Sequence, residues 1–521
     1  ESWVQKLLQQ SMAAVVAIAI SLVGLGAAGW WWLHSQSPLK LQHQSLSTPA
    51  TTRFLPREAN LTLILEADPA RLPDYGRAVA PMRQRRQAAE QLEHLRDALF
   101  AAAGLDYATE LADWLGQESA LALQSGDTPG WVLALSSRSD DGGRQFLQRF
   151  WQSRSLAGGD LDITRYRGLG VISSRGQQSQ GRPSTTSPLA EHPPLASALI
   201  NDQLVLLASS RGQLEDALDA SQEDARNLAG DPLLEQWLDS NRQGIALLRG
   251  DREGIANLLR LPAGWNSNQP IEQFVGSLQL DGAGLRLAAQ LQTSDGEPSP
   301  PLSRRDQQLL SELKQPVQRL SITRPSGPLA ALFNLEAATD DILLPVLLDG
   351  EQPLLEAQLQ DSKAWLIGSS DSSAPTASLN EALAKQGFDA NNLDGLQVWS
   401  HLTGQSDRQG QLQATVAGAT GVAQTNRWWS NSLNELRDQL QGHGSGGVPR
   451  ELLERLNAPG DAIALLGVDG RSTAELLKPW PLWRGLQLLA GQRLSSSLHG
   501  AALALSQDQS SAELNALLTF R

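Results

Sequence analysis

The hydrophobic pattern of the chain begins with one long apolar segment. From Met12 to Leu33 the sequence reads MAAVVAIAISLVGLGAAGWWWL, in which Ser21 is the one clearly polar residue. About 20 apolar residues in an α-helix span the hydrocarbon of a bilayer, where the backbone must satisfy its own hydrogen bonds. The segment closes with Trp30, Trp31 and Trp32, and indole rings prefer the membrane interface. This pattern predicts a single-pass membrane anchor.

A cleaved signal peptide is the alternative interpretation of this segment. The apolar stretch of a signal peptide is usually about 7–15 residues long, and this one is longer. One lysine lies on each side of the segment, Lys6 before it and Lys40 after it, so the positive-inside rule does not decide the orientation. An N-terminal anchor ahead of a large domain usually exports that domain, and we expect the rest of the chain outside the cytoplasm.

Beyond residue 53 the chain alternates short strands and helices. An apolar strand, WVLALSSRS, starts at Trp131 and precedes a helix with Phe146 on its apolar face. A strand at Leu169 follows, and then a hairpin whose turn is predicted at Asn201-Asp202. The helix RGQLEDALDA ends this series.

The second half of the chain repeats this order. The strand AWLIGSSD precedes a helix with Leu379 and Leu383 one turn apart. The strand GLQVWSHL and the hairpin LQATVAGATGVA follow, and a last helix is predicted from a stripe that contains Trp429, Leu433, Leu436 and Leu440. We interpret the repeated order as an internal duplication, although chance repetition of generic α+β patterns is an alternative.

Two further pairs of segments extend the correspondence. The segment GIALLRGDREGIANLL parallels DAIALLGVDGRSTAELL, and the opening strands NLTLILEADP and LAALFNLEAA also match in pattern. Strands joined by tight turns favour antiparallel pairing, so the predicted fold class is α+β, with two similar modules of mainly antiparallel sheets and packed helices. The predicted boundaries are an N-terminal segment and anchor over 1–33, a polar stalk over 34–52, the first module over 53–293, a linker over 294–305 and the second module over 306–521.

Composition narrows the classes of function. The 521 residues carry a formal net charge of −14, and binding to nucleic acid depends on Lys and Arg that neutralise phosphates, so we expect no nucleic-acid partner. Cysteine is absent, which excludes disulfides, zinc ribbons, iron–sulfur clusters and cysteine nucleophiles.

Several short motifs occur in a suggestive order. They are Leu55-Pro56-Arg57-Glu58-Ala59 before the first strand, Trp114-Leu115-Gly116 before an apolar strand, and Gly230-Asp231-Pro232 at the start of a helix. A meander at Leu285 follows a predicted turn at Asp281-Gly282. Together with the anchor and this meander, the motifs resemble the cyanobacterial domain-of-unknown-function family numbered 3352, over most of residues 53–293 and more loosely beyond. The resemblance implies a photosynthetic prokaryote, in which an anchored domain lies at the plasma or thylakoid membrane and faces the periplasm or lumen. It transfers no chemistry to particular residues.

Motifs that would indicate catalysis lack their structural context. No two of the seven histidines lie three to five residues apart, so no helical pair of metal ligands is predicted. The glycines Gly442, Gly444 and Gly447 follow a predicted helix, whereas a dinucleotide site needs them after a strand. We therefore predict no catalytic residue, cofactor or metal ligand, although a pair of carboxylates brought together by folding is invisible to a sequence pattern.

Two groups of residues are candidates for contact with a partner or with lipid. Arg83, Arg85 and Arg86 form a basic cluster at the start of a long predicted helix, where cations oppose the helix dipole. Trp428 and Trp429 form the second group, because exposed tryptophans often anchor interfaces. The alternatives are a solvated turn for the arginines and core packing for the tryptophans.

These features favour a non-enzymatic interaction or scaffold protein that is tethered to a membrane and exposes two tandem modules. The expected partners are membrane lipid, through the N-terminal helix, and a protein in or at the membrane. Two alternatives stay open: a protein that binds lipid or another apolar ligand, and a hydrolase without a recognised motif.

Overall fold

The computed structural model describes residues 37–125, 129–156, 159–174, 195–259, 271–293, 299–325, 334–335, 341–360, 362–372, 376–406, 412–442, 444, 446–478, 483, 487, 494–508 and 511–520. Within these ranges, no helix is both long enough and apolar enough to cross a bilayer. The predicted anchor over residues 12–33, with Trp30, Trp31 and Trp32, lies outside the described residues.

The first half of the chain supplies ten strands to one sheet. They are β1 (Leu61–Leu65), β2 (Leu115–Gln124), β3 (Gly130–Ser137), β4 (Leu161–Tyr166), β5 (Leu169–Ser174), β6 (Ala196–Ile200), β7 (Leu204–Ala208), β8 (Ala246–Asp251), β9 (Ile271–Asp281) and β10 (Gly284–Thr293).

The second half supplies ten more strands to the same sheet. They are β11 (Val317–Thr323), β12 (Leu354–Leu359), β13 (Trp365–Ser369), β14 (Asp389–Leu393), β15 (Leu396–Ser406), β16 (Leu412–Ala423), β17 (Asn426–Ser430), β18 (Ala462–Asp469), β19 (Leu498–Gln507) and β20 (Ser511–Phe520).

The helices fill the connections between strands. Those of the first half are α2 (Leu72–Val79), α3 (Arg85–Ala102), α4 (Gly142–Leu156), α5 (Arg211–Ala220), α6 (Pro232–Ser240) and α7 (Arg252–Leu259). Those of the second half are α9 (Arg304–Glu312), α11 (Leu343–Leu347), α12 (Thr376–Ala384), α13 (Leu433–Gln441), α14 (Gly447–Leu456) and α15 (Gly470–Leu477). Short helical turns include η1 (Pro38–His43), η2 (Ala50–Phe54), η4 (Tyr107–Leu111) and η5 (Leu228–Gly230).

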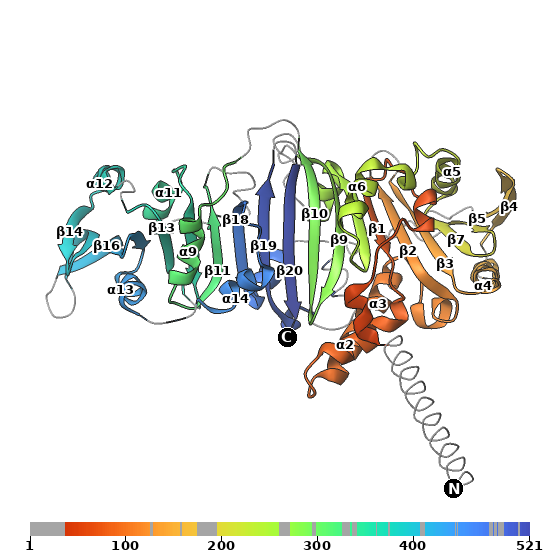
Figure 1. Cartoon of the computed structure of the whole chain (residues 1–521), viewed down its shortest axis with the longest axis horizontal. Coiled ribbons are helices and arrows are strands. Elements are labelled where there is room, and N and C mark those ends of the chain that lie inside the picture. The colour runs from red at the N-terminus through yellow and green to blue at the C-terminus, as the bar shows by residue number, and fades with distance from the viewer. Residues whose placement is uncertain are drawn as a thin grey trace, which may run out of the picture.

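All pairings between these strands are antiparallel, which confirms the predicted α+β class. The order across the first half is β4-β5-β6-β7-β3-β2-β1-β8-β9-β10. From β20 the sheet continues as β20-β19-β18-β11-β12-β13-β17-β16-β15-β14. Since β10 pairs with β20, one sheet extends along the long axis of the molecule (Figure 1), and the strand order in each half is the same counted from this pair.

The two halves meet about a local twofold axis. In the first half, Ala246 of β8 pairs with Leu278 of β9, and Leu278 pairs with Leu287 of β10. In the second half, Ala464 of β18 pairs with Leu505 of β19, and Leu505 pairs with Leu514 of β20. The next residues along β10 and β20, Ala288 and Asn515, are therefore in equivalent positions. They also pair with each other, which places the axis between them.

Helices cover both faces of the sheet in the first half. Val132 and Ala134 of β3 point into a core that includes residues of α5 and α6, whereas Trp131 and Leu133 point into a core with η4 and α4. Because both faces are covered, β3 is buried at six consecutive residues and reads as a continuous apolar run instead of an alternating one. The second half has a corresponding pair of cores, one against α9, α13 and α14 and the other against α11 and α12.

Three sequence-based expectations differ from the structure. Trp429 lies in β17, and the following helix α13 begins at Leu433, because a tight turn at Gln424 closes a hairpin that includes both tryptophans. The sequence placed the opening strand of the second half at Leu329, but the place of β1 is taken by β11, which pairs with β12 and β18. Most of the segment 329–338 lies outside the described residues. Residues 37–52 of the predicted stalk lie against the first half, where Leu41 and Leu46 are buried.

Candidate functional site

Helices α2 and α3 form a hairpin that projects beyond the ends of the strands near the middle of the sheet (Figure 1). The two helices approach closely at Gly76, where a Cβ atom would lie 3.0 Å from the carbonyl oxygen of Ala88. The base of α2 is held by Tyr75, which is 2% exposed and belongs to a small core with Leu41 and Ile245. The hairpin is therefore packed against the body of the fold at its base.

The tip of this hairpin is basic and exposed. Met82 is 82% exposed, and Arg83, Arg85 and Arg86 are exposed beside it. Arg86 pairs with Glu90 at 2.8 Å, but within the described part of the chain neither Arg83 nor Arg85 forms an ion pair. Gln84 at the N-cap of α3 makes no side-chain capping hydrogen bond, and the first turn holds no acidic residue. Since cations at this end oppose the helix dipole, Arg83 and Arg85 do not serve the stability of α3.

The chain enters the described structure beside α2. Arg71 at the start of α2 donates a hydrogen bond to the carbonyl oxygen of Ser37 at 2.9 Å. Gln42 donates to the hydroxyl oxygen of Tyr75, also at 2.9 Å. Helix α2 has 8 residues and rises by about 12 Å, and the tip follows its far end, so one short helix connects the point where the chain enters with the tip.

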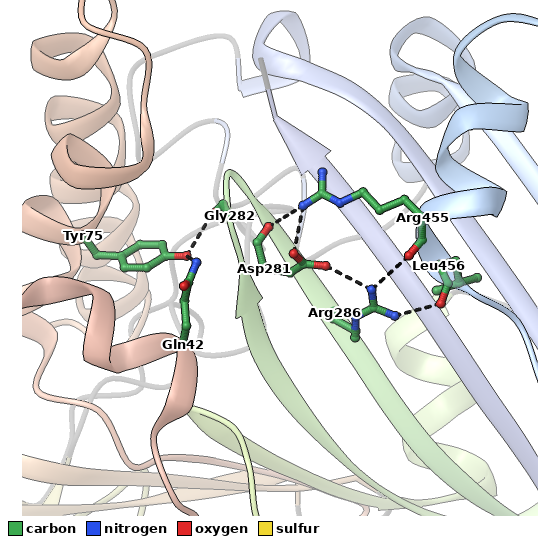
Figure 2. Close-up of polar contacts among 7 residues, drawn as sticks. All are labelled: Gln42, Tyr75, Asp281, Gly282, Arg286, Arg455 and Leu456. Carbon is green, nitrogen blue, oxygen red and sulfur yellow. Dashed lines mark hydrogen bonds and ion pairs between the residues drawn. The ribbon is translucent and has the colours of Figure 1, made fainter.

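The base of the hairpin contacts a polar cluster between the two halves, shown in Figure 2. The cluster surrounds the turn between β9 and β10, Asp281-Gly282, which the sequence predicted. Tyr75 donates its hydroxyl hydrogen to the carbonyl oxygen of Gly282 at 2.8 Å. The carboxylate of Asp281 accepts hydrogen bonds from Arg286 at 3.0 Å and from Arg455 of α14 at 2.9 Å. One turn thus connects α2 in the first half with α14 in the second.

The two arginines keep Asp281 charged. Burial alone would raise the pKa of Asp281, but the hydrogen bonds from Arg455 and Arg286 hold this pKa below its usual value. Arg286 also donates to the carbonyl oxygen of Leu456 at 3.0 Å, which caps the end of α14. Gly282 has a φ of +56°, a conformation that glycine adopts without a steric penalty. The arrangement is that of a structural joint between the halves.

Two of the motifs singled out in the sequence meet at a buried ion pair in the first half. Asp231 and Arg249 have side chains that are 1% and 6% exposed, and their charged atoms are 3.2 Å apart. Asp231 also caps α6 through the backbone N–H of Leu233, and Arg57 lies 3.8 Å from it. Arg249 donates to the carbonyl oxygen of Ala59 at 3.2 Å. Arg249 of β8 therefore holds the segment 55–59 and the start of α6 together, which is a structural role.

Two other buried carboxyl groups among the described residues, one in each half, have a raised pKa. Burial raises the pKa of Glu66 to about 7 despite hydrogen bonds from Ser47, and the charge of Glu118 raises it further. Burial also raises the pKa of Glu356 to about 7, against a hydrogen bond from the backbone N–H of Leu335. They lie on different halves and do not form a catalytic pair. Among the described residues, no group of three or more His, Asp or Glu side chains could hold a metal ion.

The structure places the candidate tryptophans in the core. Trp428 and Trp429 are each 1% exposed. Because they are neighbours in β17, their side chains point to opposite faces of the sheet, Trp428 towards α9 and α13 and Trp429 towards α11 and α12. This is the alternative of core packing that the sequence left open. The candidate arginines, in contrast, are at the surface.

The cluster at the joint was missed in the sequence apart from its turn. Tyr75, Asp281 and Arg455 come from α2, the end of β9 and α14, and no local spacing connects them. The Asp-Gly turn was the one signal available. A polar residue on each side of such a turn does not show which distant helices it will contact.

Comparison with known proteins gives a family match and distant solved structures. Residues 15–324 match the family described as "Protein of unknown function (DUF3352)". Two crystal forms of TP0453 match with TM-scores of 0.29 and 0.28 at 13% and 12% identity, each over 50% of this chain and 84% of the other. Scores this low carry no argument about fold or function. No curated protein matches the chain.

Proposed function

The chain belongs to the DUF3352 family, whose description assigns no function, and we propose that it is a membrane-tethered scaffold protein without catalytic activity. In this proposal residues 12–33 anchor the chain in the plasma or thylakoid membrane. The described residues then lie in the periplasm or lumen as two duplicated modules, approximately 53–293 and 306–521, which offer docking faces to a protein in or at that membrane.

The continuous sheet is the observation that carries this proposal. Twenty strands pair without a break from β4 to β14, and the joint at Asp281 adds side-chain contacts between the halves. Such a sheet resists bending between its halves, so two docking faces would be held at a fixed separation. When one partner contacts both faces, the second contact is intramolecular and weak contacts add up.

The equal strand order supports duplication as the origin of the two faces. Ten strands in the same order, with equivalent residues paired across a local twofold axis, are what a fused pair of related modules would produce. The halves differ mainly in their connections: residues 66–114 between β1 and β2 include the α2–α3 hairpin, whereas the shorter segment 324–353 joins β11 to β12.

Fractionation tests the tether. The full chain should remain in the membrane pellet after a carbonate wash, and a variant without residues 1–34 should move to the soluble fraction. If the shortened chain still requires detergent, a single N-terminal anchor is wrong.

Purification in mild detergent tests the scaffold role against its two alternatives. We expect a protein to co-purify in a constant ratio to the tagged full chain. A stoichiometric acyl lipid in native mass spectrometry, with no protein partner, would instead establish a lipid-binding protein. Turnover of ester or peptide substrates by the purified chain would establish an enzyme.

A further inference from the structure

We propose that the tip of the α2–α3 hairpin, formed by Met82, Arg83, Arg85 and Arg86, docks on anionic lipid headgroups of the membrane that holds the anchor. This inference rests on the proposed tether and names a second, separate contact with the same membrane. It assigns a role to the one candidate group from the sequence that the structure leaves at the surface.

The chemistry of the tip differs from that of a helix start used for stability. Helix α9 also begins with two exposed arginines, Arg304 and Arg305, but there Ser303 and Asp306 form a capping box that satisfies the helix end. Helix α3 has neither a capping hydrogen bond nor an acidic residue in its first turn. Arg86 pairs with Glu90, but among the described residues Arg83 and Arg85 have no acidic partner, and an external anion would provide one.

The apolar residue at the tip points to a membrane instead of a free anion. Met82 is 82% exposed and stands next to Arg83 in the turn between the helices. A basic cluster beside an exposed, flexible apolar side chain fits the boundary between headgroups and acyl chains, where the cations meet phosphates and the apolar group enters the hydrocarbon.

The position of the hairpin brings this tip to the membrane. Ser37 is bonded to Arg71 at the start of α2, so the chain that leads back to the predicted anchor leaves from the hairpin itself. The tip follows the far end of α2, a helix about 12 Å long, and the hairpin projects beyond the ends of the strands (Figure 1). An acidic protein would need to enter between the tip and the nearby bilayer, whereas headgroups are already there.

The base of the hairpin would transmit this contact to the sheet. Tyr75 connects α2 to Gly282, and Asp281 connects the same turn to Arg455 in the second half. A tip fixed on headgroups would therefore set the orientation of both halves relative to the membrane, because it adds a second point of contact to the proposed anchor.

The absence of cysteine allows a direct test with single labels in the full chain. Met82→Cys is labelled with an environment-sensitive maleimide that does not cross membranes, after reconstitution into vesicles of phosphatidylcholine alone or with about one third phosphatidylglycerol. Ile163→Cys is the control, because Ile163 is 73% exposed on β4 at the outer edge of the first half. The readouts are the emission shift and quenching by iodide.

We expect the label at position 82 to shift to shorter wavelength and to lose iodide quenching on anionic vesicles, while the label at 163 does not change. High salt should reverse the effect. Each basic residue near an anionic surface increases binding by about fivefold, so Arg85→Glu with Arg86→Glu should reduce docking by about 25-fold or more. Arg304→Glu with Arg305→Glu changes the same charge at the same position of another helix, and it should leave docking unchanged.

The outcomes separate this inference from the tether. A chain that does not float with any vesicle would overturn the proposed anchor. A chain that floats, but whose label at 82 stays open to iodide on anionic vesicles, would overturn the docking of the tip alone. Equal protection on neutral vesicles would reject recognition of anionic headgroups. Protection in native membrane extracts but not on pure lipid would identify an acidic protein as the occupant and reject lipid.

Discussion

The buried carboxyl group of Glu356 makes the stability of the second half depend on pH in a predictable direction. Glu356 lies in β12 with 0% exposure, and one of its oxygens accepts a hydrogen bond from the N–H of Leu335 at 2.6 Å. The other oxygen has no hydrogen-bond partner within the described part of the chain. Replacing Glu356 by Gln keeps the size and an acceptor for Leu335 but removes the ionisable group.

The magnitude follows from the pKa. Burial raises the pKa of Glu356 from 4.5 to about 7, against the opposing charge of Arg319, so the native state holds a proton that the unfolded state has lost between these two values. The stability that this proton provides is fully present below about pH 4.5 and is lost as the pH rises through about 7. A shift of about 2.5 units corresponds to at most about 3 kcal/mol in the free energy of unfolding.

Denaturant unfolding of the wild type and Glu356→Gln at about pH 5 and about pH 8 measures this effect. We expect the variant to be more stable by about 2–3 kcal/mol at the higher pH and close to the wild type at the lower pH. Glu66→Gln is the parallel variant in the first half, where burial raises the pKa of Glu66 to about 7 as well. A difference between variant and wild type that is the same at both pH values would refute the reasoning.

Three further substitutions test individual contacts by their effect on the free energy of unfolding. Arg249→Ala should lower the free energy of unfolding by about 3–5 kcal/mol, because it leaves Asp231 buried without its main partner. Its control is Arg242→Ala, which breaks an exposed pair with Asp239 and should change the free energy of unfolding by less than about 1 kcal/mol. Gly76→Ala should lower the free energy of unfolding by about 1–3 kcal/mol, because the new Cβ meets the carbonyl oxygen of Ala88. Its control is Gly212→Ala in α5, where the nearest atom to the new Cβ is the hydroxyl oxygen of Ser210 at 3.9 Å; it should raise the free energy of unfolding by about 0.5–1 kcal/mol. Tyr75→Phe should cost about 1–2 kcal/mol because the carbonyl oxygen of Gly282 and Gln42 both lose a partner, and an unchanged value would show that the hydroxyl contacts do not hold the hairpin.

Most strands and helices could be predicted because their signals are local. The Asn201-Asp202 turn has φ values of +49° and +59°, as expected of a two-residue hairpin turn, and the helix after it begins at Arg211 with Ser210 as its cap. The correspondence between β8 with α7 and β18 with α15 was also visible, since both pairs carry the same apolar run before an aspartate.

The errors came from signals that two structures share. Trp429, Leu433, Leu436 and Leu440 fit a helical stripe, but Trp429 is in a strand because its neighbour Trp428 must reach the opposite core. Two adjacent large aromatic residues fit a strand with both faces covered as well as they fit a helix. The helical spacing from Trp429 to Leu433 arose by coincidence, because these residues lie in different elements. The strand β11 was missed because Arg319 and Ser321 interrupt its apolar pattern.

Contacts between strands and side chains that are distant in the chain could not be predicted from the sequence. Nothing local indicates that β10 and β20 pair over nine positions or that Asp281 receives Arg455. Both strands alternate apolar and polar residues, which predicts a half-buried strand but does not name its neighbour. The partner is determined by which edges remain open after the local hairpins have formed.

The inner edge of the first half, formed by β10, allows a prediction about this half alone. Without β20, the strand β10 would present an open edge with Leu285, Leu287, Ala289 and Leu291 on one face, and long open edges of this kind pair with other chains. The outer edges are protected differently: β14 is a five-residue strand that is exposed throughout, and β4 contains Asp162 and Arg165. The inner edge is therefore the one that needs a partner.

Residues 37–293 expressed alone should form a twofold dimer through β10. In the whole chain the axis passes between Ala288 and Asn515, so in the dimer Ala288 would pair with Ala288 of the second copy. Light scattering after gel filtration should give twice the mass of one half. Ala289→Pro should yield monomer, because Ala289 pairs with Leu514 in the full chain and proline there removes a ladder hydrogen bond across this edge. The same proline in the full chain should lower stability without changing its mass. A stable monomer of residues 37–293 at micromolar concentration would show that β10 protects its own edge. The pairing of β10 with β20 would then depend on the two halves being joined in one chain.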